Sequence, residues 1–173
     1  MAAPTLKPDP AQQASTFTMQ QQEAHDWCWA AVTVSLHRYL APNSSLTQAQ
    51  LASQVLPRCN GDPNSAGCNQ PASLTQALNL LHRQVADPIL APISFAQIRQ
   101  TIDSGWPIPV RIVWDENPAN AHFVVISGYA VSGSGGQFVQ VDDPFYDRSI
   151  VDYDTFVSDY HGAGQWERTY RVG

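Results

Sequence analysis

The spacing of apolar residues changes near residue 104, from a helical pattern to a strand pattern. Before that point apolar residues recur every three or four positions, and after it they fall in β-rich runs. Helix patterns cover residues 28–40, 46–56, 73–82 and 94–103, with a short helical turn at 153–160. Strand patterns cover residues 108–114, 123–130, 137–142, 148–151 and 166–172. Helices followed by an antiparallel sheet predict an α+β fold.

The composition is typical of one globular domain. With 173 residues and 43% hydrophobic side chains, the chain is long enough to bury one core. Residues 1–15 are rich in Pro and Gln, which predicts a flexible N-terminal lead. Residues 16–173 are expected to form a single domain, with a helical half at about 16–104 and a sheet half at about 105–173.

Charge and hydropathy argue against two classes of partner. The formal net charge is −6, and the nine Lys and Arg residues form no cluster, so nucleic-acid binding has little support. No apolar run approaches the roughly 18 residues that a membrane span needs, so we expect no membrane contact.

Cys28 opens the first helix pattern and is a candidate nucleophile. A helix N-terminus carries partial positive charge and free N–H groups, which stabilise a thiolate and can also bind an oxyanion. The side-chain amide of Gln22, six residues earlier, can supply a second oxyanion donor. One short segment therefore predicts both a nucleophile and an oxyanion hole.

A thiol nucleophile needs a base and a group that orients the base. His122 begins an apolar strand pattern that would hold its ring in place, whereas the other four histidines lie in less suitable positions. Asp142 and Asp143 end the next strand pattern, and the glycine-rich turn at 132–136 predicts a hairpin that brings them level with His122. Because neighbouring strand residues point to opposite faces, only one of the two should bind the imidazole.

Three segments together carry a family resemblance: Gln22 with Trp27-Cys28-Trp29-Ala30, Ser104 through Val110, and His122 through Gly128-Tyr129. They resemble the active-site segment, the strand before the histidine and the histidine strand of papain-like cysteine peptidases. The chain is most similar to the compact bacterial members, which include bacteriocin-processing peptidases and plant-pathogen avirulence proteases. The resemblance covers roughly residues 17–145. It implies a helical half packed on an antiparallel sheet half, with the active-site cleft between them.

The resemblance also implies the role of each site residue. The compact members use Cys-His-Asp with the aspartate just before a proline, which selects Asp143, before Pro144, and leaves Asp142 as the alternative. His25 departs from the pattern, because papain-type enzymes usually have a disulfide cysteine at that position. Trp27 is a candidate for the substrate cleft, with core packing as its alternative. Trp106 is a second cleft candidate, with a packing or rim position as its alternative.

The expected activity is a cysteine endopeptidase that works through an acyl-enzyme and needs no cofactor or metal. Its partners would be a protein or peptide substrate and a cognate inhibitor or immunity protein. One alternative is a transglutaminase- or acyltransferase-type enzyme with the same Cys-His-Asp chemistry. Another is a non-catalytic peptide-binding module of the same fold.

The remaining cysteines bear on the compartment. Cys59 and Cys68 bracket a loop rich in turn residues, which suggests a disulfide that leaves Cys28 free. Two thiols in a reducing cytosol are the equally weighted alternative. Such a bridge would contribute about 2.5–3 kcal/mol of stability on the chain-entropy model. The N-terminus has no apolar signal core. We nevertheless expect a secreted protein or a bacterial effector or toxin delivered into a target cell.

Overall fold

The structure is a computed structural model that describes residues 17–173, so the lead expected at 1–15 lies outside the described residues. The helices of this part are α1 (Cys28–Leu40), α2 (Gln48–Val55), α3 (Leu74–Leu80), α4 (Phe95–Asp103) and α5 (Tyr153–Ser158). The strands are β1 (Gln84–Ile89), β2 (Ile108–Trp114), β3 (Asn117–Val131), β4 (Gln137–Asp143), β5 (Asp147–Asp152) and β6 (Gly164–Val172). The α+β class is confirmed. Within residues 17–173, no helix has both the length and the apolar character needed to cross a membrane.

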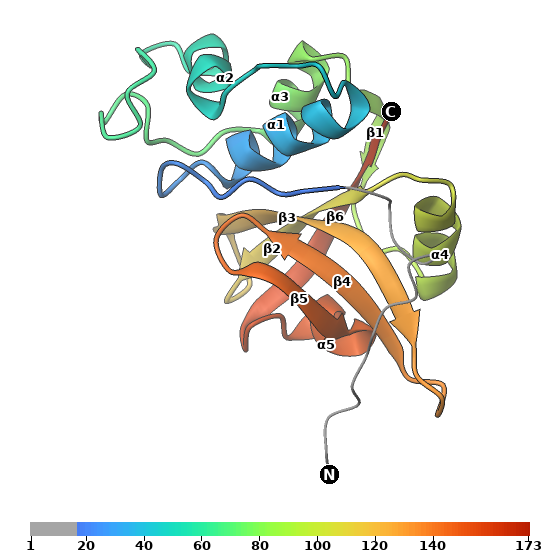
Figure 1. The fold of residues 1–173 in the computed structure, drawn as a ribbon. Coiled ribbons are helices and arrows are strands. Elements are labelled where there is room, and N and C mark those ends of the chain that lie inside the picture. Colours follow the sequence, from blue (N-terminus) through green and yellow to red (C-terminus); the bar gives the residue numbers. More distant parts are fainter. Residues whose placement is uncertain (1–16) are drawn as a thin grey trace.

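All six strands of the described chain form one sheet, in the order β1-β6-β2-β3-β4-β5, and every neighbouring pair is antiparallel. Figure 1 shows this twisted sheet below the layer that contains α1, α2 and α3. Strand β1 is not among the strands predicted from the sequence; it is an edge strand that contains Pro88 and, within the described chain, pairs with β6 alone. Proline is tolerated at a sheet edge but weakens the strand pattern.

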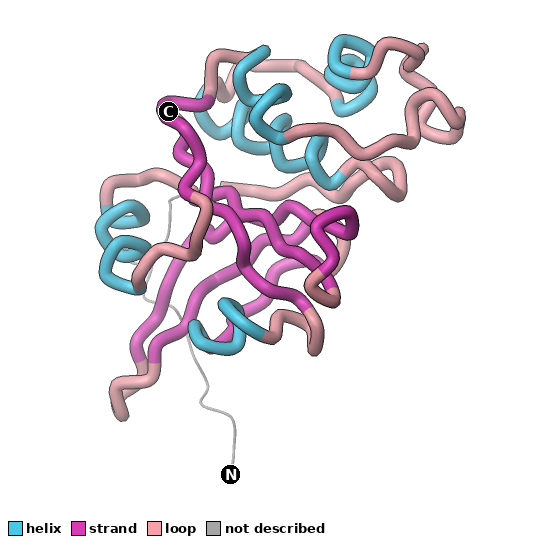
Figure 2. The backbone as a smooth tube through the Cα atoms, turned by 180° about the vertical axis from the view of Figure 1, so that it is seen from behind, coloured by secondary structure: helices cyan, strands magenta, loops and turns pink. Residues whose placement is uncertain are grey.

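Two hydrophobic cores lie on opposite faces of the sheet. On β3, Phe123 and Val125 pack with α1, α2 and α3, whereas Val124 and Ile126 pack with α4 and α5. This alternation follows from the two-residue period of side chains along a strand. Figure 2, from behind, shows the three-helix layer along one end of the sheet and the two other helices beside the strands.

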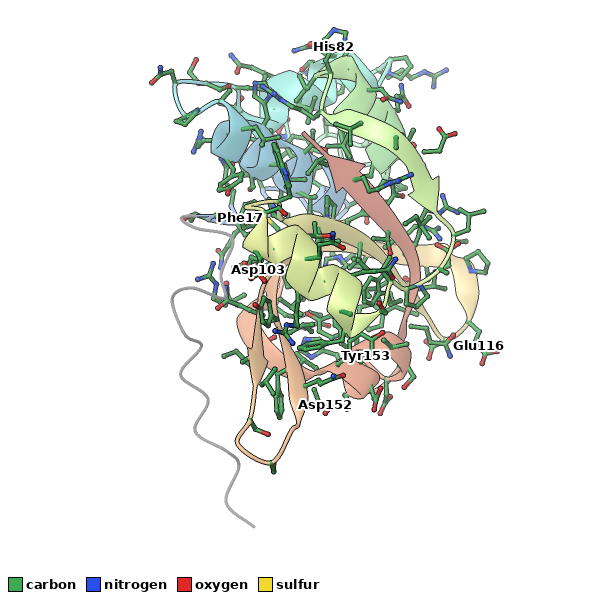
Figure 3. All side chains as sticks on the ribbon, turned by 90° about the vertical axis from the view of Figure 1, so that its right-hand side faces the viewer. Phe17, His82, Asp103, Glu116, Asp152 and Tyr153 are labelled. Atoms are coloured by element: carbon green, nitrogen blue, oxygen red, sulfur yellow. A yellow bond between two sulfur atoms is a disulfide. The ribbon has the colours of Figure 1, made fainter. Side chains whose placement is uncertain are left out.

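Helix α4 packs differently from the division expected near residue 104. Its apolar residues Phe95, Ile98 and Ile102 form one helical stripe and belong to the core on the α5 side of the sheet. Tyr153, at the start of α5, makes an edge contact with Phe95 at 5.8 Å between ring centroids, and its hydroxyl donates to the carbonyl of Ile93 over 2.9 Å. Figure 3 shows Tyr153 close to α4. The α4 segment, counted with the helical half by its pattern, therefore belongs to the sheet half by its packing.

Candidate functional site

Cys28 is the first residue of α1, the most deeply buried helix of the three-helix layer. Its N-cap residue makes no side-chain capping hydrogen bond, and the first turn contains no acidic residue. The partial positive charge of this helix end is therefore not neutralised by the helix's own side chains. The Cys28 thiol is free, and the residue is 8% exposed. It lies at the helix N-terminus that the sequence pattern indicated.

The residues on both sides of Cys28 are anchored to one neighbouring loop. The indole N–H of Trp27 donates to the carbonyl of Cys68 over 2.6 Å, and that of Trp29 donates to the carbonyl of Gln70 over 3.0 Å. Cys68 is itself bonded to Cys59, with an S–S distance of 2.08 Å. These contacts fix the start of α1 and hence the position of the thiol.

Strand register places Asp143 beside His122. Asp142 pairs with Val125, so the next pair along the ladder brings Asp143 level with Val124. Because strand side chains alternate, Val124 and His122 share one face, and Asp143 shares it with them. The imidazole Nε2 lies 2.8 Å from Oδ1 of Asp143. Alternation thus explains why only one of the two aspartates meets the histidine.

Asp142 points to the other face and has a different set of partners. It accepts hydrogen bonds from the hydroxyl of Ser127 and from Arg148, whose Nε lies 2.7 Å from Oδ1. Arg148 also donates from Nη2 to the carbonyl of Phe17 over 3.1 Å. Arg148 of β5 therefore joins the Asp142 carboxylate to the start of the described chain, on the face of the sheet away from His122.

Asp143 is held by four donors. Besides the imidazole, Oδ1 accepts from the backbone N–H groups of Phe145 over 2.8 Å and Tyr146 over 3.0 Å. Oδ2 accepts from the hydroxyl of Tyr160 over 2.8 Å. Burial alone would raise the pKa of Asp143, but the bond with His122 and the two backbone N–H groups hold that pKa below its usual value. The carboxyl is therefore ionised and fixed in orientation at neutral pH.

The imidazole of His122 interacts with both Asp143 and Cys28. Burial alone would lower the pKa of His122, but hydrogen bonds to Asp143 and Cys28, and the charges of both groups, raise it to about 9. At neutral pH the ring is therefore an imidazolium between a carboxylate and a sulfur atom. The folded chain thus brings together three of the predicted residues, Cys28, His122 and Asp143, although they come from α1, β3 and β4.

Two hollows meet at Cys28 and together form a cleft along the rim between the helical layer and the sheet. One has a volume of about 260 Å³ and is lined by His122, Trp114 and Tyr146 among others. The second has a volume of about 330 Å³ and is lined by Leu74 and Tyr170 among others. Cys28, Pro71 and Ala121 border both hollows, which makes them neighbouring parts of one groove.

Gln22 lines the same cleft as Cys28. Its backbone N–H donates to the carbonyl of Pro144 over 3.0 Å, which joins it to the segment after Asp143. Its side-chain Nε2 donates to the carbonyls of Ala24 over 3.1 Å and His25 over 2.5 Å, and its buried Oε1 has no hydrogen-bond partner among residues 17–173. Gln22 is therefore in the expected place, but both amide donors are engaged within its own loop.

The two tryptophans proposed for the substrate cleft lie elsewhere. Trp27 is fully buried in the helical core, because its indole fills that core while its N–H bonds to the backbone of Cys68. Trp106 is 41% exposed and borders a separate groove between α4 and the end of β6. The expectation that they line the substrate cleft was therefore wrong.

Two other aromatic residues occupy the site and were not identified from the sequence. Trp114 stacks on His122, with 6.3 Å between ring centroids, and lines the cleft. Tyr160 stacks on Trp114, with 6.1 Å between ring centroids, and its hydroxyl donates to Asp143. Burial and the neighbouring Asp143 carboxylate raise the pKa of Tyr160, so its hydroxyl keeps its proton. No local pattern distinguishes these residues, because tertiary packing alone brings them to the histidine.

Within residues 17–173, no group of three or more His, Cys, Asp or Glu side chains is placed to hold a metal ion. The contacts of Cys28, His122 and Asp143 support the chemistry of a buried thiol beside an imidazolium whose orientation is fixed by a carboxylate. Such a pair can attack a carbonyl carbon and then protonate the leaving group.

Comparison with known proteins gives one family and several structures. The model of the peptidase C39-like family matches residues 14–173. A crystal structure described as a C39-like peptidase from Bacillus anthracis has a TM-score of 0.58 at 15% identity, covering 94% of this chain and 98% of that one. A crystal structure of SERA5E from Plasmodium falciparum has a TM-score of 0.53 at 10% identity, covering 95% and 92% respectively. At these identities the likeness concerns the fold alone. A comparison with curated protein sequences gives no match.

Proposed function

Because the chain belongs to the peptidase C39-like family and has the fold of a cysteine peptidase, we propose that it is a cysteine endopeptidase with Cys28, His122 and Asp143 as its triad. The observation that carries the proposal is the buried His122, whose imidazole bonds to Asp143 and interacts with Cys28 in one cleft. The expected resemblance to compact papain-like peptidases is confirmed at the level of family and fold.

The reaction follows from the charges of these groups. The Cys28 thiolate attacks the carbonyl carbon of the scissile peptide bond and forms a tetrahedral oxyanion. The imidazolium of His122 gives its proton to the leaving amine as the C–N bond breaks, which leaves a thioester. A water molecule then gives a proton to the neutral imidazole and attacks the thioester, releasing the acid and the thiolate. Asp143 keeps the ring oriented through both steps.

The oxyanion hole in this proposal comprises the backbone N–H of Cys28 and the side-chain amide of Gln22. The start of α1 supports the first donor, because its N–H groups are not capped by a side chain. The second donor requires Gln22 to release one of its bonds to the carbonyls of Ala24 and His25. Replacing one carbonyl acceptor with an oxyanion is favourable, because a charged acceptor binds a donor more tightly.

The test compares the wild type with Cys28→Ala on a proteome-derived peptide library, and with a thiol-directed epoxide. The chain has three cysteines, and two of them form the disulfide, so the epoxide should label one site in the wild type and none in Cys28→Ala. New peptide termini should appear with the wild type and with Arg38→Ala, a control change in the last turn of the same helix. Cleavage by Cys28→Ala at the wild-type rate would reject the proposal. Incorporation of an added amine in preference to hydrolysis would favour the acyltransferase alternative.

The compartment forms a second part of the proposal, which is that the protein is secreted or delivered out of the cell that makes it. The bond between Cys59 and Cys68 supports this, because structural disulfides persist in oxidising surroundings. Titration of thiols in the denatured, unreduced protein from its natural source should find one free thiol. Three free thiols would contradict this part of the proposal.

A further inference from the structure

The two hollows of the cleft differ in charge. The hollow that includes His122 is also lined by His25 and Asp26, which contact each other at 3.0 Å. The other hollow is lined by Arg111 and Arg168, and no carboxylate is among its lining residues. In a chain with a net charge of −6, this concentrates positive charge beside the nucleophile.

The arrangement of the two arginines is unfavourable for the fold by itself. Arg111 on β2 lies directly opposite Arg168 on β6 in the antiparallel ladder. Like charges in that position repel each other and destabilise a sheet. Glu167 lies between them, 2.9 Å from Nη1 of Arg111 and 3.1 Å from Nη2 of Arg168. One carboxylate therefore faces two guanidinium groups, and one positive charge is left without a counterion among these three residues.

The arginines also retain hydrogen-bonding capacity in a site partly shielded from water. The side chain of Arg111 is 16% exposed and that of Arg168 is 32% exposed. Nη2 of Arg111 donates to the carbonyl of Pro118 over 2.6 Å, whereas the buried Nε of Arg168 has no hydrogen-bond partner in the described part of the chain. A carboxylate entering this hollow would supply both a counterion and an acceptor with the planar geometry that guanidinium prefers.

The proposed reaction determines which part of the substrate occupies this hollow. The leaving amine takes its proton from His122, so the residues after the scissile bond lie over the hollow that His122 lines. The acyl part, which stays on Cys28, continues into the other hollow, which Cys28 lines and His122 does not. That part of a substrate ends in an amine and not in a carboxylate, so an acid there must be a side chain.

We propose that Arg111 and Arg168 form a specificity site for an aspartate or glutamate side chain among the three residues that precede the scissile bond. The inference rests on the proposed peptidase function and adds the class of substrate to it. Trp29, Leu74 and Phe123 also line the hollow and give apolar contact for the methylene groups of such a side chain. Arg168 binds the carboxylate, and Arg111 with Glu167 holds Arg168 in place.

The first experiment needs only the wild-type chain. Cleavage sites in a proteome-derived peptide library should be enriched in Asp and Glu at one of the three positions before the cut. Quenched-fluorescence peptides that differ only by Glu or Gln at that position should then differ about tenfold in kcat/KM, as a charge-assisted hydrogen bond supplies. Equal rates for the two peptides would overturn the inference and leave the peptidase function standing.

Variants then assign the preference to its residue. Arg168→Gln should lower kcat/KM for the Glu peptide about tenfold more than for the Gln peptide, whereas Arg168→Lys should retain most of the preference. Arg58→Gln is the matched control, because Arg58 is exposed in the loop near the disulfide and lines neither hollow. A Glu preference that survives in Arg168→Gln would contradict the assignment to Arg168, because another group would then bind the acidic side chain.

A readout without turnover separates this inference from the proposed function. Peptidyl epoxides that carry Glu or Gln at the same position should label Cys28 in the wild type at rates that differ about tenfold. Labelling at equal rates would reject the specificity site alone. No labelling of Cys28 by either compound, together with no cleavage of the library, would reject the peptidase function itself.

Discussion

At the level of single residues, the site depends on how His122 keeps its proton. The ring is buried, which disfavours a charge, yet Asp143 on one side and Cys28 on the other stabilise the imidazolium. Asp143 can do so because its four donors fix the carboxylate in the ionised form. His122 therefore keeps the proton that the leaving amine needs over a wide range of pH.

We predict from this that kcat/KM stays high until the pH approaches 9 and falls above it. The pKa of His122 is raised to about 9 from 6.5, so the proton donor is present below about 9 and is lost as the pH rises through that value. Rates with a neutral peptide from acidic to strongly alkaline pH give the profile. Asp143→Asn should move the alkaline limb to lower pH, because the carboxylate charge that raises the pKa is removed. A wild-type alkaline limb near 6.5 would contradict the prediction.

Tyr160 contacts the Asp143–His122 pair from the side away from the substrate. Its hydroxyl binds Oδ2 of Asp143, and its ring packs against Trp114, which in turn stacks on His122. Tyr160→Phe keeps the ring and removes one of four hydrogen bonds to the carboxylate. Such a bond is worth about 1 kcal/mol, so the orientation of the histidine should loosen without being lost.

We predict that Tyr160→Phe lowers kcat about threefold to tenfold with little change in KM, by the same figure of about 1 kcal/mol. Steady-state kinetics on one quenched peptide separate the two constants. Tyr153→Phe is the matched control, because it removes a partly buried hydroxyl that donates to the carbonyl of Ile93, away from the cleft. An equal loss in both variants would mean that Tyr160 matters for folding and not for the position of Asp143.

The site residues differ in whether a local sequence pattern indicates them. Cys28 was identified because it begins a helix pattern, and His122 because it precedes an apolar run that lies within β3. Asp143 was chosen over Asp142 because the family resemblance implies an aspartate before a proline, and the strand register then explains why Asp143 meets His122. Trp114 and Tyr160 lie far apart in sequence and meet only in the folded sheet. A tertiary contact between two aromatic rings leaves no periodic pattern in the sequence. The sequence therefore could not show which aromatic residues lie at the site.

At the level of elements, the loop closed by Cys59 and Cys68 supports the start of α1. The backbone carbonyls of Cys68 and of Gln70, two residues beyond the bridge, accept the two indole N–H groups that flank Cys28. The loop therefore serves as a platform for the nucleophile in addition to its effect on chain entropy. Opening the loop should disturb the thiol even though the bridge itself lies outside the cleft lining.

We predict that the Cys59→Ser, Cys68→Ser double variant loses about 2.5–3 kcal/mol of unfolding free energy, because the unfolded chain gains conformational freedom. It should also label more slowly at Cys28 with the epoxide. Urea denaturation gives the free energy, and mass spectrometry gives the labelling rate. Ser65→Ala, a change within the same loop that leaves the bridge intact, is the control. Unchanged stability and labelling in the double variant would assign the loop no supporting role.

Most elements could be predicted because their patterns are local, and the exceptions have physical reasons. Helices α1 and α4 begin and end where the apolar spacing and the flanking residues indicated. Strand β1 was missed because an exposed edge strand with a proline has little apolar alternation. The apolar stripe of α4 shows that the helix packs on something, but not on which face of the sheet.

At the level of the whole molecule, the site lies at the rim where the helical layer meets the sheet, and Phe123 and Val125 of β3 share a core with that layer. Cys28 belongs to the helical layer, whereas His122 and Asp143 belong to the sheet. The segment before α1 joins the two, because Gln21 bonds to Asp147 over 2.8 Å and the N–H of Gln22 bonds to Pro144 over 3.0 Å. The distance between sulfur and imidazole therefore depends on how firmly the layers are held together.

A ligand that contacts both layers should then stabilise the whole fold. We predict that a peptidyl epoxide bound to Cys28 raises the thermal unfolding temperature by several degrees, because its peptide part spans both hollows and binds only the folded chain. Iodoacetamide modifies the same thiol, but its small adduct reaches neither Leu74 of the helical layer nor Tyr170 of the sheet, which both line the second hollow. It should leave the temperature unchanged or lower it, because it also blocks the Cys28 sulfur, whose hydrogen bond and charge help to raise the pKa of His122. Calorimetry on the two adducts and on the epoxide-treated Cys28→Ala variant decides the matter. Equal shifts from both adducts would mean that the layers are rigidly joined without substrate and that the cleft gains nothing from being bridged.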